Sequence, residues 1–314
     1  MTLGIPDPRS VQRLLRRPAP SVPRPLPLRD PTPDPGLFGP GSVTWVVMRE
    51  PRLLLAAGRA LLLQAANPLV AQGAIEHSTY KSDPYGRLER TVRWVTIVCF
   101  GTTQEAERVS SRVSGLHRPV AGTLPEANAT SRVPSGTPYT ASAPALLRWV
   151  HASFVDTMLV AHDSLVGGLS RAERDAFVRE WDAVARLMGL PRDMCWPDHA
   201  ALRRYVDREV RRGPALPGAG SREVAETVLH PPVRSRVLRP GTDALAFIAT
   251  GLLPPELRRG YGLTWTPAHL AAFSALTRSL RLATNALPRR LRISPVYDLA
   301  LARSEGRWPE SRAA

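Results

Sequence analysis

The residues best suited to chemistry in this chain are its histidines, and His117 has the most unusual position. Val109, Val113, Leu116 and Val120 recur with it at helical spacing, so we expect His117 to point with an apolar stripe into the core. An imidazole in that place has two interpretations. It is either a buried histidine bonded to a carbonyl, or a neutral axial ligand of a buried haem iron, which needs apolar walls around it.

Two further histidines lie on one long apolar segment. His151 and His162 are eleven residues apart, close to three helical turns, and therefore project from nearly the same side. Their separation along the helix axis is roughly 16 Å, which excludes a shared metal ion. We expect His151 to be a pocket residue and His162 to lie at the surface.

A group of basic and polar residues shares one helix face through i, i+3, i+4 and i+7 spacing. The group consists of Arg87, Arg90, Thr91 and Trp94. Two arginines on a largely buried helix need acidic partners, and Glu76 or Asp83 could supply them. Carboxylates of a cofactor, such as the propionates of a haem, are the alternative, because an arginine fork binds a carboxylate bidentately.

Other catalytic motifs are missing from the sequence. It contains no Glu-x-x-His, His-Glu-x-x-His or Cys-x-x-Cys motif, no Gly-rich phosphate loop and no Gly-x-Ser-x-Gly elbow. Only Cys99 and Cys195 occur, which excludes a disulfide framework and favours a reducing compartment. Cys195 lacks the glycine-rich loop expected around a thiolate ligand of iron.

Helical signals dominate from Gly41 onward and predict an all-α, multi-helix fold. Thr102 with Glu105 and Ser170 with Glu173 form capping boxes that open two of the helices. The expected helices span 42–50, 51–66, 69–77, 86–100, 102–120, 143–166, 171–188, 200–211, 222–229, 241–250, 254–259 and 267–285. No alternating strand pair or Asn-Gly turn is present, and residues 123–142 are expected to form a long loop.

Proline content divides the chain into two parts. Eleven of the 32 prolines fall within residues 1–40, where they prevent a continuous helix. We therefore predict an extended, Pro- and Arg-rich N-terminal arm over residues 1–40 and one helical domain over residues 41–314.

The formal charge of +15 would suit a nucleic-acid partner, but its distribution does not. All basic residues except Lys81 are arginines spread through every segment, with no basic block interleaved with aromatics. We expect a solvated basic surface and no nucleic-acid partner. The first 30 residues lack an apolar signal core, and the apolar stretch Ala244–Leu253 is too short to span a bilayer. We therefore expect a cytoplasmic protein without membrane insertion.

Ordered motifs between residues 37 and 290 carry a family resemblance. They are Leu63–Gly73, His77-Ser78, Asp83-Pro84, Gly86–Thr91, Phe100-Gly101, Leu116–Gly122, Tyr139, Pro144–Ala152, Leu169–Glu173 and Met188–Pro191. This set resembles the MpaB-type oxygenases, a family distantly related to the latex-clearing protein, a rubber oxygenase.

The resemblance implies an all-helical fold with a globin-like core around one buried haem b, whose iron is held by a histidine. It matches Arg87, Arg90 and Thr91 to the residues that line the haem pocket and His117 to the iron ligand, with His151 as the second candidate. The second basic position here is Arg90 where the rubber oxygenase has lysine, and the glutamate base proposed there has no match.

Two functions are compatible with these features. The first is a haem b-dependent oxidoreductase that uses O₂ or peroxide to oxidise an apolar or aromatic organic substrate. Its reacting site would contain Arg87, Arg90 and Thr91, with Trp94 as a further haem contact. The alternative is a helical haem-binding, ligand-binding or scaffold protein without turnover.

Overall fold

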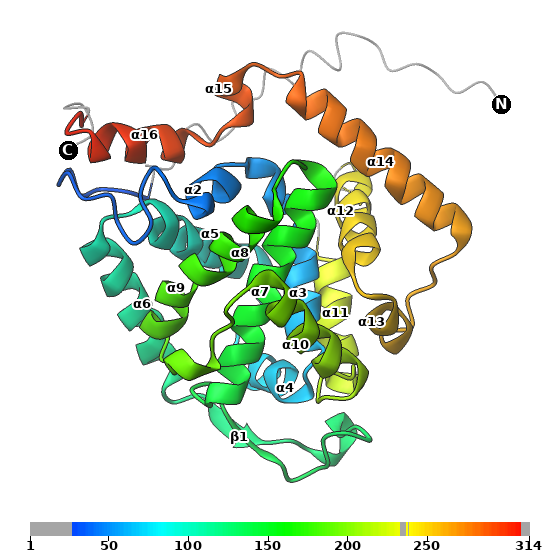
Figure 1. The fold of residues 1–314 in the computed structure, drawn as a ribbon. Helices are drawn as coiled ribbons and strands as arrows, with labels where there is room; N and C mark the ends of the chain where they lie inside the picture. Colours follow the sequence, from blue (N-terminus) through cyan, green and yellow to red (C-terminus); the bar gives the residue numbers. More distant parts are fainter. Residues whose placement is uncertain (1–26, 233–236, 238, 309–314) are drawn as a thin grey trace.

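The computed structural model describes residues 27–232, 237 and 239–308 and is almost entirely helical (Figure 1). The first half contains α2 Val43–Met48, η1 Pro51–Ala56, α3 Ala57–Ala65, α4 Pro68–His77, α5 Pro84–Phe100, α6 Thr103–His117 and α7 Pro144–Leu165. The second half contains α8 Arg171–Glu180, α9 Asp182–Leu187, α10 His199–Arg211, α11 Ala219–Leu229, α12 Arg239–Leu252, α13 Pro255–Gly260, α14 Pro267–Asn285, α15 Arg289–Arg292 and α16 Pro295–Ser304. Two short 3-10 turns are η2 Glu126–Asn128 and η3 Arg192–Met194. The predicted all-α fold is confirmed.

The helix starts follow the capping signals in the sequence. Thr102 with Glu105 and Ser170 with Glu173 both form complete capping boxes at the starts of α6 and α8. Ser42 accepts a hydrogen bond from the Trp45 amide at the start of α2. Each of these side chains satisfies an amide that the first helical turn leaves without an intrahelical partner.

Four predictions differ from the structure. The expected helix over residues 51–66 is divided into the 3-10 segment η1 and the α-helix α3. The expected loop over residues 123–142 is framed by an antiparallel hairpin of strands β1 Ala121–Thr123 and β2 Pro138–Thr140. The expected helix over residues 171–188 is divided at Trp181 into α8 and α9. The short helices α15 and α16 follow Pro288 and Ser294-Pro295 and were not predicted, because α15 is only four residues long and α16 has weak periodicity.

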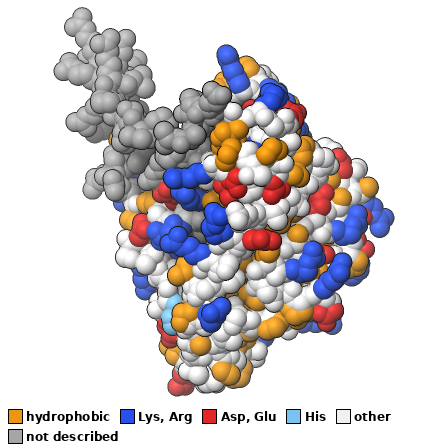
Figure 2. Space-filling view, turned by 90° about the vertical axis from the view of Figure 1, so that its left-hand side faces the viewer, with side chains coloured by type: hydrophobic (Ala, Val, Ile, Leu, Met, Phe, Trp, Pro, Cys, Tyr) orange, Lys and Arg blue, Asp and Glu red, His pale blue; other side chains and the backbone are white. Residues whose placement is uncertain are grey.

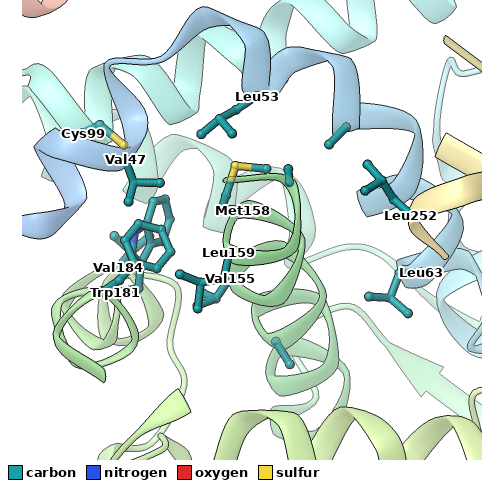
Figure 3. Close-up of a cluster of buried hydrophobic side chains, with 14 of the residues drawn as sticks. Val47, Leu53, Leu63, Cys99, Val155, Met158, Leu159, Trp181, Val184 and Leu252 are labelled. Atoms are coloured by element: carbon teal, nitrogen blue, oxygen red, sulfur yellow. The ribbon is translucent and has the colours of Figure 1, made fainter. Parts of the chain in front are cut away.

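The core surrounds α7, which runs through the centre of the molecule (Figure 1). Most of its residues between Leu146 and Leu165 are buried. Figure 3 shows Val155, Met158 and Leu159 of α7 among side chains from α2, η1 and α9. A helix that is apolar around most of its circumference must be covered by neighbours on several sides, and α3, α9, α10 and α14 all contact α7.

The described part of the predicted arm lies against the body. Residues 27–41 contain no helix or strand, and Leu28 is buried. The Arg29 and Asp30 amides donate to Glu105, and Asp34 accepts from the Thr103 amide at the start of α6. Residues 1–26 lie outside the described part of the chain, so the extent of the arm as a separate segment stays a prediction.

Charged side chains of both signs are interspersed on the face shown in Figure 2. Within the described ranges, no single helix is long and apolar enough to cross a membrane. The segments Pro51–Ala65 and Pro68–His77 are together long and apolar enough to cross one, but the chain bends by 107° at the break between them.

A buried ion pair joins four helices at the centre. Arg59 of α3 bonds Asp156 of α7 at 2.6 Å, and it also donates to Thr157 at 2.5 Å and to the Leu252 carbonyl of α12 at 2.8 Å. Arg203 of α10 reaches the other oxygen of Asp156 at 2.9 Å. Burial alone would raise the pKa of Asp156, but Arg59 and Arg203 outweigh it and hold this pKa below its usual value.

We predict that Asp156→Asn lowers the free energy of unfolding by about 3–5 kcal/mol, because it leaves Arg59 buried without its counter-charge. Arg203→Gln, at a half-exposed position, should cost about 1 kcal/mol or less. Denaturant titration measures both. Because the pKa of Asp156 is depressed on folding, its contribution is complete above the unfolded value near 3.8 and is lost as the pH falls below that value. An Asp156→Asn protein as stable as the original would contradict this role.

Candidate functional site

An apolar cleft is lined by residues of η1, α3, α4, α5, α11 and α12. The space not filled by protein atoms amounts to about 1240 Å³, and part of it is open to solvent. Its wall is mostly aliphatic, with Leu61, Val70, Val224 and Ala249 facing inward from four helices. Tyr85, Leu88, Leu54 and Leu245 are exposed large apolar side chains at its rim.

Arg87 is the only charged side chain among the described residues that line this cleft. Its guanidinium has no hydrogen bond or ion pair to any described residue, and burial followed by the charge of Arg90 lowers its pKa. The acidic partners considered from the sequence are engaged elsewhere. Asp83 binds Arg90, and Glu76 binds Tyr139 and Gln72. A cation without a counter-ion in an apolar cleft is suited to an acidic ligand.

The other residues of the predicted arginine face do not all share this position. Thr91 lines the cleft and donates its hydroxyl to the Arg87 carbonyl at 3.0 Å. Arg90 does not line the cleft; it bonds Asp83 at 3.0 Å and Thr79 at 3.1 Å and is 61% exposed. Trp94 packs against the core, and its Nε1 is buried without a partner among the described residues. Arg90 and Trp94 therefore do not line the cleft with Arg87 and Thr91, although all four residues lie on α5 at the predicted spacing.

His117 is the last residue of α6 and is half-buried, and does not lie inside the core. Leu116 beside it is 66% exposed, so the expected apolar stripe does not continue to the end of α6. Burial, and secondly the nearby charge of Arg87, lower the pKa of His117. Both effects favour the neutral ring, which has no hydrogen-bond partner among the described residues, and His117 is not among the residues that line the cleft.

His151 occupies a different environment from His117. Its ring is stacked parallel to Trp196, with 6.0 Å between centroids, and lies 6.4 Å from the ring of Trp181. Its Nε2 is buried without a partner in the described structure, and burial lowers its pKa to about 4. The structure thus separates His151 from the cleft and places it in an aromatic box.

His162 is buried, so the prediction of a surface position is wrong. Burial lowers its pKa to about 4. The C-terminal half of α7 is covered on the side that the sequence pattern assigned to solvent.

Within the described residues, no cluster of three or more His, Cys, Asp or Glu side chains could hold a metal ion.

A polar pair at the cleft was missed by sequence reasoning. Tyr80 is buried on the cleft wall and donates its hydroxyl to Glu223 at 3.0 Å, and Lys81 pairs with the same carboxylate at 2.5 Å. Burial, followed by the bond to Glu223, raises the pKa of Tyr80. Tyr80 and Glu223 are 143 positions apart, so no local spacing could have indicated that they meet.

Comparison with known families places this cleft within a recognised domain. The model of the family described as "ER-bound oxygenase mpaB/B'/Rubber oxygenase, catalytic domain" matches residues 44–282. That range includes every helix that lines the cleft. Searches of curated proteins and of solved structures found no match.

We predict that Arg87→Met stabilises the ligand-free protein by about 0.5–2 kcal/mol, because it removes a partly buried charge that has no counter-charge in the fold. Arg90→Met is the matched control on the same helix. It breaks only an exposed ion pair and should change stability by less than about 1 kcal/mol. Chemical denaturation of both variants gives the comparison. A large destabilisation by Arg87→Met would show that Arg87 is structural.

Proposed function

Because the chain belongs to the family of mpaB and rubber oxygenase catalytic domains, it is an oxygenase-type domain, and we propose that it oxidises an organic substrate with haem b as its cofactor. The observation that carries this proposal is the uncompensated Arg87 in an apolar cleft. A porphyrin is a flat apolar ring system with carboxylates at one edge, and the cleft combines aliphatic walls with one cation. The residues that line the cleft therefore fit the ring and its carboxylates, and the iron ligand would come from a residue outside this lining.

Within this proposal, Arg87 would bind a propionate, and Thr91 would line the same wall one helical turn further along α5. His117 would hold the iron, supported by its ring nitrogens, which bind no described residue, and by the effect of the nearby Arg87 charge on its pKa. Bound haem would supply the oxygen and one-electron chemistry, with O₂ or peroxide as the oxidant. The protein's task would be to exclude water and to orient the substrate against the aliphatic walls.

His151 stays the second candidate for the ligand, because its buried Nε2 has no partner among the described residues. Two tryptophan rings occupy the space beside it, whereas His117 lies near the charge that the cleft presents. These contacts favour His117. Arg90 is a weaker candidate for a cofactor contact than Arg87, since Asp83 and Thr79 already bind it.

The second candidate function is a haem or ligand carrier without turnover. It is favoured by one observation: no carboxylate or histidine that could move a proton to a substrate is among the described residues of the cleft wall, and His117 itself lies outside this lining. The two proposals differ in whether the haem-loaded protein oxidises aromatic and aliphatic substrates with O₂ or peroxide.

We also propose a cytoplasmic location. Cys99 and Cys195 are both free thiols, and burial raises the pKa of Cys195 to about 11, so it is poorly reactive at neutral pH. Free thiols are typical of a reducing compartment.

We predict that the purified protein binds added haem with a strong Soret band that shifts with cyanide or CO. His117→Ala should abolish or greatly weaken haem retention while the helical circular dichroism is preserved, because the ring lies at a helix end and not in the packed core. His151→Ala is the comparison. If His117→Ala keeps an unshifted, full-strength Soret band and His151→Ala loses it, the iron ligand is His151. A purified protein that does not bind added haem would refute the proposal.

We predict a different result for Arg87→Met in the same titration. Loss of a charge-assisted hydrogen bond costs about 1.5–3 kcal/mol, so the haem dissociation constant should rise about 10- to 150-fold while the wavelength of the Soret band is unchanged. Arg90→Met should leave the affinity within about twofold of the original, since a loss of 0.4 kcal/mol or less is about twofold. Equal losses in the two variants would show that total charge, and not the position of Arg87, attracts the haem.

A further inference from the structure

The C-terminal end of α14 and the helix α15 form an exposed surface of unusual composition. Leu282, Leu287 and Leu291 are 64%, 42% and 63% exposed, although they fall within ten residues of one another. Arg278 and Arg290 are exposed beside them. Hydrogen bonds from the Leu287 amide to Thr284 and from the Leu291 amide to Pro288 keep this segment in tight turns. We call these five residues the leucine–arginine patch.

The charge around the patch has one sign only. Between Leu257 and Tyr297 the chain contains seven arginines and no aspartate or glutamate. Arg289 is paired with Asp298 at 2.7 Å, but neither Arg278 nor Arg290 has an ion pair with any described residue. Figure 1 shows α14 along the outer edge of the molecule with α15 beyond its end, so the segment is not covered by the described helices.

From this juxtaposition of exposed leucines and unpaired arginines we propose that the leucine–arginine patch docks the protein on an anionic lipid surface. Leucines would enter the acyl boundary while arginines contact the headgroups, the arrangement that interfacial helices use. A second copy of the chain fits less well, because a two-fold contact would bring the same arginines together. The surface would hold the protein peripherally, without a spanning helix.

The patch is connected to the rim of the cleft. Arg52 of η1 donates to Thr284 and, at 3.0 Å, to Asn285 at the end of α14. Leu54, two residues later, is 55% exposed and belongs to the cleft rim. If the cleft oxidises an apolar substrate, which rests on the proposed function, docking here would bring its mouth near the membrane in which such a substrate dissolves.

The test is co-sedimentation of the full chain with phosphatidylcholine vesicles with and without about one-third phosphatidylglycerol. We expect binding to the anionic vesicles only, and weaker binding as the salt concentration rises. Arg278→Gln with Arg290→Gln should lower the partition coefficient about 25-fold, since each arginine near an anionic surface contributes about fivefold. The control, Arg112→Gln with Arg171→Gln, has the same net charge but changes exposed arginines of α6 and α8.

The leucines are tested in the same way. Leu282→Ser with Leu291→Ser should lower binding about tenfold or more, whereas Leu116→Ser, at an equally exposed leucine of α6, should not. Equal losses in the patch and control variants would overturn the proposal. A dimer in sedimentation velocity that the leucine variant dissolves would assign the patch to a second copy, and binding to an acidic polypeptide without vesicle binding would assign it to a protein. Because no haem is needed, failure here leaves the proposed function intact.

Discussion

The ion pair between Arg59 and Asp156 holds together the helices on which the cleft depends. Arg59 uses its Nε and both terminal nitrogens to contact α7 and α12, so α3 cannot shift without breaking several bonds in a buried site. Gly58, the preceding residue, allows close approach on the cleft side, because a Cβ there would lie 2.9 Å from that of Ala249. The spacing of α3 and α12, which both line the cleft, therefore follows from one satisfied buried charge and one missing side chain.

Arginine serves opposite purposes in two places of this fold. Arg59 is almost fully buried, and every donor group finds an acceptor. Arg303 is also buried, and it contacts the Phe100 carbonyl and Glu105, which ties α16 to the start of α6. Arg87 has no such partner although carboxylates lie close along the chain. The charge of Arg59 is thus compensated inside the fold, whereas that of Arg87 lies in the cleft, where a ligand can supply the missing counter-charge.

Local signals predicted the helices well because capping boxes and proline positions act within four residues. They predicted the site only in part. Arg87 and Arg90 have similar helical phase, yet Asp83 at the helix start captures only Arg90. The burial of His162 and the exposure of Leu116 depend on where neighbouring helices end, which periodicity in one segment does not contain. The bond between Tyr80 and Glu223 requires the packing of α11 against α4 and thus the whole fold.

The arginines that give the net charge of +15 have different surroundings in different parts of the fold. Some arginines are neutralised by ion pairs inside the fold, and others pair with acidic residues on the surface. Neither set produces a strong positive electrostatic potential over one face of the molecule. The C-terminal segment differs because it has no acidic residue over α14 and α15 and also exposes leucines. Charge of one sign beside apolar area favours an amphipathic, anionic surface over a purely ionic partner. Since Arg52 links this segment to the cleft rim, the surface that would attract the protein and the opening that would admit an apolar substrate lie on connected elements.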